Sequence, residues 1–326
     1  MGGSKNPSLL LHIGVYMISQ PIQDEELSTF LKNLPDDHRT TYLLQDKNVR
    51  LTGVAATTMV NKMRANHHLG FLEAYILAQA YIAGALLSST IKGNDRLSLQ
   101  IECGGPIKGL SVEAWSCGAV RGYLANNHIE LKEPLTSLDT SPFYGPGFLS
   151  ITKFIEGEKA PFTGTVMLEH GNLANDLALY FKESEQTPTL FYISINFDKS
   201  MRIIGAGGLF IQALPGCPDG LLEELQEKAT HLPNLSHQIS SGLTVEEYIE
   251  REFATFKPEH VGHNYIGFSC PCSEKSFKAY LQNLSAKEQE EILKGAFPLE
   301  LECLNCGTKY TFTKSELNTL WEEKKA

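Results

Sequence analysis

The segment LSLQIECGGPIKGLSVEAW, residues 97–115, decides the fold class. Apolar and polar residues alternate up to its double glycine, and they alternate again in its second half. Two such runs joined by a short glycine-containing connection are typical of an antiparallel hairpin. LFYISINF (190–197), a DKS turn and MRIIGAGGLFIQAL (201–214) predict a second hairpin, and the glycines inside its second strand indicate a bulge or a close backbone approach.

Helical patterns lie between these hairpins. The run AYILAQAYIAGALLSST (74–90) is largely apolar but falls just short of the roughly 18 residues expected of a membrane span, so we interpret it as a packed core helix. Residues 172–184 carry apolar side chains at mostly helical spacing. Hairpins with interspersed helices predict an α+β fold built on antiparallel sheets.

The length and the net charge of the chain limit the classes of protein to which it can belong. The chain has 326 residues, 42% of them hydrophobic, which predicts about two folded domains. Its net charge of -10 argues against nucleic acid as the main partner. The N-terminus has neither the basic start nor the long apolar core of a secretory signal. We therefore expect a cytoplasmic protein without a membrane partner, and we interpret residues 1–16 as an extension that need not belong to the natural protein.

The composition changes after Leu214. Residues 219–260 hold nine Asp or Glu against three Lys or Arg, so 3 − 9 = -6 of the net charge lies in this segment. Moderate apolarity with such self-repulsion predicts a marginally stable linker, although an ordinary acidic pair of surface helices has the same composition. Its apolar residues in helical registers include Leu221, Leu222, Leu225, Val245, Tyr248 and Ile249.

Residues 261–326 are predicted to form a separate C-terminal domain after a core of residues 17–218. FPLELEC (297–303) and YTFT (310–313) are typical of short strands. A domain of about 65 residues has a small core, so a bound metal would help to stabilise it. Helix N-caps are predicted at Ser273, at Ser285 with Glu288, and at Thr313 with Glu316, and a helix end at Gly295.

Four of the seven cysteines cluster in this domain, as Cys270-Pro-Cys272 and Cys303-Leu-Asn-Cys306. Two close pairs separated by 30 residues are typical of a zinc site in which four thiolates complete a tetrahedral shell. In a reducing cytosol we predict that these four cysteines bind one Zn²⁺ per chain. Nearby, His260 and His263 could replace a ligand, but four sulfurs already fill the shell.

The same cysteines are suited to a redox switch. Four cysteines allow three pairings, and spacing favours Cys270 with Cys272 and Cys303 with Cys306. Because zinc binding supplies folding free energy to a small domain, oxidation of its thiolates would release the metal and unfold the domain. The isolated cysteines, for which the sequence indicates no role, are Cys103, Cys117 and Cys217.

Three further segments are specific: GAVRGY (118–123), DLALYFKESEQTPT (176–189) and AGGLFIQALPG (206–216). Together with the cysteine spacing, they make the chain resemble the redox-regulated thirty-three-kilodalton heat-shock chaperones. The resemblance runs from about Met17 to Thr313, and the first 16 residues have no counterpart in the family.

The resemblance implies a chaperone that is not an enzyme. Members of the family hold unfolding client proteins without ATP and prevent their aggregation under oxidative and heat stress. Their reduced, zinc-bound form is largely inactive; oxidants release zinc, form disulfides within the pairs and unfold the linker, and activated forms dimerise. For this chain it implies disulfides Cys270–Cys272 and Cys303–Cys306 in the oxidised state, a metastable linker at 219–260, and client binding by the six linker residues named above.

Two alternatives keep the zinc site as a static ribbon. In an enzyme, Gly205 to Gly208 (GAGG) would have to be a dinucleotide loop, but the third glycine of that motif is absent. No catalytic motif contains His67-His68, Glu169-His170 or Arg121, so we interpret these residues as structural. Of these, we expect Arg121 to lie at the surface. In a nucleic-acid-binding protein, the ribbon would need a cationic face, yet residues 262–326 hold eight Lys against nine Glu.

Overall fold

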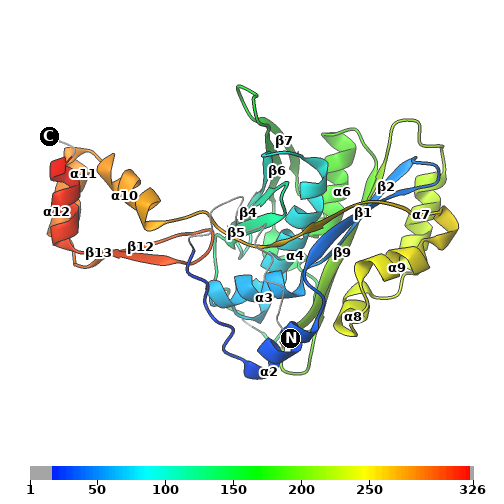
Figure 1. The fold of residues 1–326 in the computed structure, drawn as a ribbon, viewed down its shortest axis with the longest axis horizontal. Helices are drawn as coiled ribbons and strands as arrows, with labels where there is room; N and C mark the ends of the chain where they lie inside the picture. The colour runs from blue at the N-terminus through cyan, green and yellow to red at the C-terminus, as the bar shows by residue number, and fades with distance from the viewer. Residues whose placement is uncertain (1–16, 132, 324–326) are drawn as a thin grey trace.

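The computed structural model describes residues 17–131 and 133–323, and its core is built on two sheets (Figure 1). The interpretation of residues 1–16 falls outside the described residues. Strands of the first sheet pair antiparallel throughout. In spatial order they are β10 (Glu259–Tyr265), β1 (His38–Leu44), β2 (Val49–Ala55), β9 (Ile203–Ala213) and β8 (Thr189–Phe197).

The second sheet has six strands and contains the hairpin predicted at residues 97–115. Leu99 pairs with Val112, so the alternating residues of both strands share one buried face. Only the short edge strand β11 runs parallel to its neighbour, β5. In spatial order the strands are β11 (Gly267–Phe268), β5 (Ala119–Leu124), β4 (Gly109–Trp115), β3 (Arg96–Cys103), β6 (Gly147–Phe154) and β7 (Phe162–Met167).

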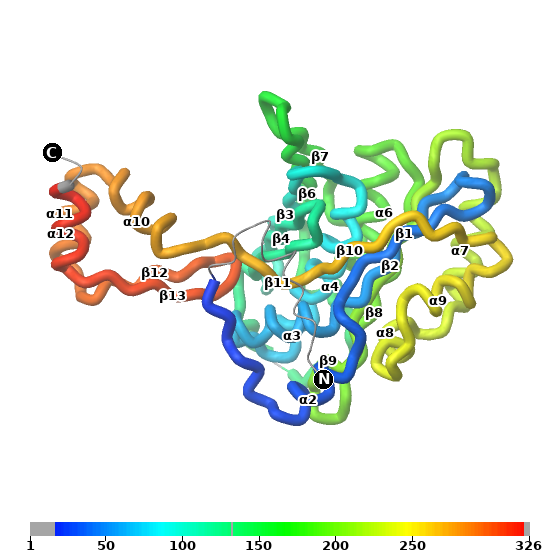
Figure 2. Tube along the Cα trace, in the orientation of Figure 1, coloured from blue at the N-terminus to red at the C-terminus, as the bar shows by residue number. Residues whose placement is uncertain are grey.

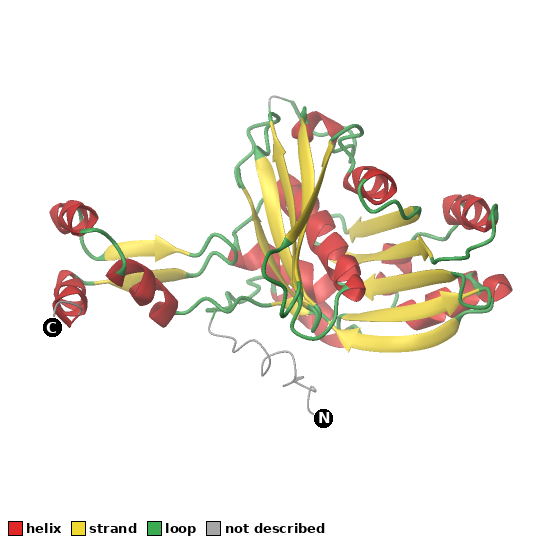
Figure 3. Cartoon of the chain, turned by 90° about the horizontal axis from the view of Figure 1, so that it is seen from above, coloured by secondary structure: helices red, strands yellow, loops and turns green. Residues whose placement is uncertain are grey.

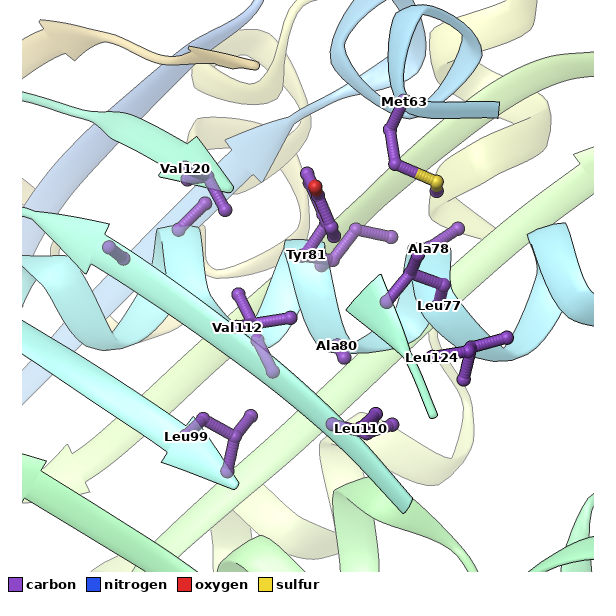
Figure 4. Packing of buried hydrophobic residues seen from close by; sticks show 14 of the residues in the cluster. Met63, Leu77, Ala78, Ala80, Tyr81, Leu99, Leu110, Val112, Val120 and Leu124 are labelled. Carbon is purple, nitrogen blue, oxygen red and sulfur yellow. The ribbon is translucent and has the colours of Figure 1, made fainter. Parts of the chain in front are cut away.

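Helix α4 (Phe71–Leu87) packs against strands of both sheets. Its sequence is apolar on every side, as expected of a helix with no solvent face. Figure 4 shows Ala80 and Tyr81 of this helix near Val112 of β4. Within the described residues, the helical stretch Phe71–Thr90, which continues α4, is long and apolar enough to cross a membrane. Because 89% of its apolar window is buried inside the protein, it confirms the predicted core helix.

The remaining core helices lie around the sheets. Helix α6 matches the helix predicted at residues 172–184, and together with both hairpins it confirms the α+β fold. The predicted close approach in the second hairpin also exists, because a Cβ on Gly205 would lie 2.0 Å from the Ser236 carbonyl oxygen. These helices are α2 (Glu25–Asn33), α3 (Thr57–Asn66), α5 (Ser141–Tyr144) and α6 (Leu173–Glu183), with a 3₁₀ turn, η1, at Ser88–Thr90.

The acidic linker is folded on the outer face of the five-stranded sheet. It forms α7 (Leu221–Thr230), α8 (Leu235–Ser240), α9 (Val245–Glu252) and the 3₁₀ turn η2 (Ala254–Phe256). A capping box between Thr244 and Glu247 begins α9. The apolar side chains of these helices meet β2 and β9 in a second hydrophobic cluster, separate from the one around α4.

After the linker the chain crosses the edges of both sheets before it reaches the cysteines. β10 lies along β1 (Figure 2), and β11 then pairs with β5 through Gly267 opposite Ala119. Ser269 N–H continues this pairing by donating to the Val120 carbonyl oxygen at 3.0 Å. The segment that leads into the C-terminal domain is therefore hydrogen-bonded to the core.

The C-terminal domain projects from the core as a hairpin with helices at its outer end (Figure 3). The predicted caps and strands are present: Ser273 and Ser285 form capping boxes, and Thr313 exchanges hydrogen bonds with Glu316. Its elements are α10 (Glu274–Gln282), α11 (Ala286–Lys294), β12 (Leu299–Glu302), β13 (Lys309–Phe312) and α12 (Lys314–Glu323).

Candidate metal centre

The four clustered cysteines meet where the C-terminal domain joins the core. Cys270 and Cys272 follow β11, and Cys303 and Cys306 lie in the turn between β12 and β13. All four are buried, and their sulfur atoms lie within 4.8 Å of one another. Cys270 Sγ is 3.8 Å from Cys303 Sγ, and Cys272 Sγ is 3.4 Å from Cys306 Sγ. We call this cluster the cysteine centre.

A tight turn positions the second pair. Cys306 N–H and Gly307 N–H both donate to the Cys303 carbonyl oxygen, at 3.1 and 2.8 Å. Gly307 has φ +67°, a left-handed conformation that glycine adopts without steric cost. A Cβ there would also lie 2.4 Å from the Asn66 carbonyl oxygen, so the turn sits directly against the end of α3.

The donor set fits a soft divalent metal ion. Sulfurs of a tetrahedral zinc site with Zn–S bonds of about 2.3 Å lie roughly 3.8 Å apart, close to the separations found here. The cluster contains four sulfurs and no carboxylate or imidazole. Four buried cysteines in this arrangement could hold a metal ion, and their softness is consistent with zinc.

Hydrogen bonds favour a thiolate at this centre. The pKa of the Cys270 thiol is lowered mainly by its hydrogen bond with Cys272, and then by those with Cys303 and Cys306. Burial opposes this shift, and the hydrogen bond from Arg121 lowers the pKa further. From within the C-terminal domain, Tyr310 Oη lies 3.3 Å from Cys272 Sγ. The contacts of Cys270 stabilise a thiolate at this residue, whereas the hydrogen bond to Cys270 raises the pKa of Cys272 and of Cys303.

Three core residues donate hydrogen bonds to the segments that form the cysteine centre. Asn66 Nδ2 donates to the Cys306 carbonyl oxygen at 2.9 Å, and Gly122 N–H donates to the Asn305 carbonyl oxygen at 3.2 Å. Arg121 Nη1 donates to Cys270 Sγ at 3.2 Å. The expectation that Arg121 lies at the surface is wrong: its side chain is 18% exposed, because β5 directs it between Glu113 and the cysteine centre.

The isolated cysteines stay apart from this centre. Cys103, Cys117 and Cys217 are each partly exposed and belong to no metal-ligand cluster among the described residues. Burial raises the pKa of the Cys103 and Cys217 thiols. Both thiols are therefore less reactive at neutral pH than an exposed cysteine.

The linker residues predicted to bind clients are covered in this conformation. Five of the six are buried against the core sheet, and Leu222 is partly buried beside them. The buried ones are Leu221, Leu225, Val245, Tyr248 and Ile249. Client contact through them would require the linker to leave the sheet.

A second cluster of titratable side chains was not predicted from the sequence. Glu246 of α9 lies 2.8 Å from His38 Nε2 of β1 and 3.2 Å from His263 Nδ1 of β10. The two imidazole rings stack at 4.8 Å. His263 thus belongs to this cluster and not to the cysteine centre, where it had been considered as a replacement ligand.

The other residues weighed as catalytic have structural contacts. Glu169 and His170 N–H groups both donate to Asp176 Oδ1 at 3.0 Å, which fastens the loop before α6. His67 is largely buried beside the cysteine turn, and burial lowers its pKa. The GAGG segment lies inside β9 and opens no helix.

Comparisons of the sequence and of the structure with known proteins all point to the same family. The family model described as "Hsp33 protein" matches residues 37–313. A "33 kDa chaperonin" from Agathobacter rectalis is 32% identical over 279 residues, 84% of this chain and 96% of that protein. One from Bacillus subtilis is 32% identical over 88% of this chain and 99% of its own length. The crystal structure of the 33 kDa chaperonin from Thermotoga maritima matches with a TM-score of 0.77 and 30% identity, over 89% of this chain and 99% of that one.

Proposed function

Because this chain belongs to the Hsp33 protein family and so to a group of chaperones, we propose that it is a redox-regulated holdase of the cytoplasm. In this role it binds unfolding proteins without ATP and prevents their aggregation during oxidative and heat stress. It is a binding protein and not an enzyme. The observation that carries the proposal is the buried four-sulfur centre at the junction between the C-terminal domain and the core.

The reduced protein is the resting state. Cys270, Cys272, Cys303 and Cys306 hold one Zn²⁺, which keeps all four sulfurs as thiolates and supplies folding free energy to the C-terminal domain. In this state the apolar side chains of α7 and α9 are packed on the core and unavailable to clients.

Oxidation of the cysteines starts activation. Two molecules of peroxide take two electrons each from the four thiolates and, with four protons, become four water molecules. Cys270 then bonds to Cys272 and Cys303 to Cys306, and Zn²⁺ leaves because a disulfide sulfur is a poor metal ligand. The short sulfur contacts given above join the two pairs and not the members of each pair, so the turns must rearrange as the disulfides form.

Loss of the centre would propagate into the linker. The C-terminal domain is connected to the linker through β10 and β11, so its unfolding removes one end of the support for the acidic helices. Their charge of -6 favours an extended chain once packing is lost. Leu221, Leu222, Leu225, Val245, Tyr248 and Ile249 would then face clients, and activated chains would associate as homodimers.

The test is a paired assay on the full chain. Peroxide at a heat-stress temperature is expected to release one zinc per chain, measured with a chromogenic chelator, and to switch on suppression of client aggregation, measured by light scattering without ATP. A variant with Cys103, Cys117 and Cys217 replaced by serine keeps both responses. Zinc release without any change in aggregation would contradict the switch, and salt-sensitive binding of DNA or RNA would favour a static zinc ribbon.

A further inference from the structure

Arg121 uses its guanidinium to join the core sheet to a sulfur of the cysteine centre. Its Nε donates to Glu113 Oε2 at 2.7 Å, and its Nη1 donates to Cys270 Sγ at 3.2 Å. The Trp115 ring lies 5.2 Å from the guanidinium carbon. The planar group is thus oriented by a carboxylate on one side and meets a sulfur on the other.

The sheet holds Arg121 in this orientation. Glu113 of β4 is the direct cross-strand partner of Arg121 of β5, so the ion pair follows from the register of the hairpin. Glu113 also pairs with Arg96 of β3. Two guanidinium groups and one carboxylate leave a net charge of about +1, which faces a centre of four thiolates whose charge with Zn²⁺ is about -2.

Strand pairing brings Cys270 to this charge. Phe268 pairs with Val120, and the N–H of Ser269 donates to the Val120 carbonyl oxygen, which leaves Cys270 next to Arg121 of the neighbouring strand. The other core contacts, from Asn66 and Gly122, reach backbone carbonyl oxygens, whose charge does not change when sulfur is oxidised. Among the described residues, the hydrogen bond that the core donates to a sulfur comes from Arg121.

We propose that Arg121 is a positioning residue that holds the cysteine centre against the core only while Cys270 is a thiolate. A thiolate accepts a charge-assisted hydrogen bond from the guanidinium, whereas a disulfide sulfur is neutral and a weak acceptor. Formation of the Cys270–Cys272 disulfide therefore removes the sulfur partner of Arg121, which keeps its ion pair with Glu113, and weakens the attachment of β11 to β5. This inference rests on the proposed function, because it assigns the residue through which oxidation loosens the contact with the core.

Substitution of Arg121 in the reduced, zinc-loaded full chain tests the inference. R121M is expected to speed hydrogen exchange at the amides of Gly267 and Ser269 by roughly tenfold or more, the size expected for loss of one charged hydrogen bond. Exchange in β3 and in α4 stays as in the unsubstituted protein. In the Co²⁺-substituted protein, the thiolate-to-metal charge-transfer band keeps its intensity and shifts in energy, since the ligands remain but the hydrogen bond to one sulfur is lost.

Arg96 provides a matched control. It also pairs with Glu113 and lies over the Phe154 ring, but it does not contact a sulfur. R96M is expected to leave exchange at Gly267 and Ser269 unchanged. R121K keeps the positive charge but lacks the planar guanidinium, so we expect the Gly267 and Ser269 amides to be partly protected from exchange in this variant. If R121M does not fold, R121K takes its place in the comparison.

Two results would overturn the inference. One is unchanged exchange at Gly267 and Ser269 in the R121M and R121K variants, and the other is an equal effect of R96M. Neither measurement involves an oxidant or a client. Failure of the oxidised, unsubstituted protein to suppress aggregation would therefore contradict the proposed function, while the exchange data would still decide whether Arg121 holds β11 to the core.

Discussion

At the scale of single residues, Glu246 fastens the linker to the core through a histidine that acts as a double donor. His38 Nδ1 lies 2.7 Å from the Asp36 carbonyl oxygen, and its Nε2 lies 2.8 Å from Glu246. Burial alone would lower the pKa of His38, but the hydrogen bond with Glu246 raises it above its usual value. The pKa of Glu246 falls to about 2, because hydrogen bonding and charge from His38 outweigh its burial.

These shifts define a pH window for the docking of α9. His38 contributes stability fully below its unfolded pKa of about 6.5, and the contribution is lost as pH rises through the higher folded value. Glu246 contributes above its unfolded pKa of about 4.5, and its share is lost as pH falls toward about 2. The contact is therefore strongest between about pH 4.5 and pH 6.5.

Glu246→Gln is expected to weaken linker docking by about 1 kcal/mol at pH 6, since it removes one charged hydrogen bond that is partly screened by solvent. The difference from the unsubstituted protein shrinks as pH rises past the folded pKa of His38. This difference in docking stability is measured by hydrogen exchange of the α9 amides at pH 6 and pH 8.5, corrected for intrinsic exchange rates. Burial raises the pKa of neighbouring Asp37 to about 7, so Asp37 also titrates in this pH range. Its effect is the same in the variant and in the unsubstituted protein, and it cancels when the two are compared.

Glu247→Gln is the control for this change. Glu247 is exposed and closes the capping box with Thr244, a role that glutamine also fills. A loss of docking in the Glu247 variant equal to that in the Glu246 variant, or one independent of pH, would argue against the histidine contact.

The clustering of the four cysteines could be predicted because the members of each pair are close in the sequence. Cys270 with Cys272 and Cys303 with Cys306 are each close in sequence, so spacing and residue type revealed the cluster. Arg121 and Cys270 are 149 positions apart, and His38 and Glu246 are 208 apart. No periodicity or motif connects residues at such separations, because strand pairing between distant segments brings them together.

At the scale of elements, α9 is seated on a glycine of β2. A Cβ on Gly53 would lie 2.4 Å from Val245 Cγ1 and 2.9 Å from Ile249 Cδ1. The absence of a side chain at this position lets the apolar face of the helix reach the sheet.

Gly53→Ala is expected to destabilise linker docking by roughly 1–3 kcal/mol, the usual cost of overpacking. The reduced protein should then suppress client aggregation before any oxidant is added, and it should bind more of a dye that fluoresces on apolar surfaces. Gly262→Ala on β10 is the control, since its Cβ would meet no atom within 4 Å. Unchanged dye binding and aggregation in the Gly53 variant would show that the linker tolerates the extra methyl group.

The elements also show where sequence patterns carry little information. Both hairpins follow from strand-like patterns and α4 from a long apolar run, and all three were predicted. β10, EHVGHNY, has no alternation of apolar residues, and most of its side chains are exposed. As an edge strand it is held by backbone hydrogen bonds to β1, so its sequence carries no strand signal; the sequence-based boundary at residues 260 and 261 falls inside it.

At the scale of the whole molecule, the C-terminal domain has little core of its own. No residue of α11 is buried, and the Trp321 indole N–H donates to the Leu281 carbonyl oxygen at 2.9 Å between α12 and α10. Among the described residues after Cys272, the buried apolar ones outside the cysteine centre are Leu281, Tyr310, Phe312, Leu317 and Trp321.

Removal of the metal under reducing conditions is expected to unfold this domain and leave the core intact, because most of the apolar cluster around α4 is formed by core residues, although the cluster continues into this domain. Tryptophan fluorescence measures this unfolding. In a Trp115→Phe variant, Trp321 is the remaining tryptophan. Its emission should shift to longer wavelength when a chelator is added and return when Zn²⁺ is added back. Circular dichroism checks that most secondary structure persists. A chelator without effect on Trp321 would mean that the domain folds without metal.

One stretch of chain, β10 followed by β11, occupies the outermost position in both sheets. Its departure would leave β1 and β5 as edge strands with unpaired amide and carbonyl groups facing water. Such an edge accepts any extended backbone, because its hydrogen bonds do not depend on side-chain identity. Opening one junction would thus create two sequence-independent pairing surfaces beside the apolar surface bared by the linker, a combination suited to proteins that share only the loss of their own structure.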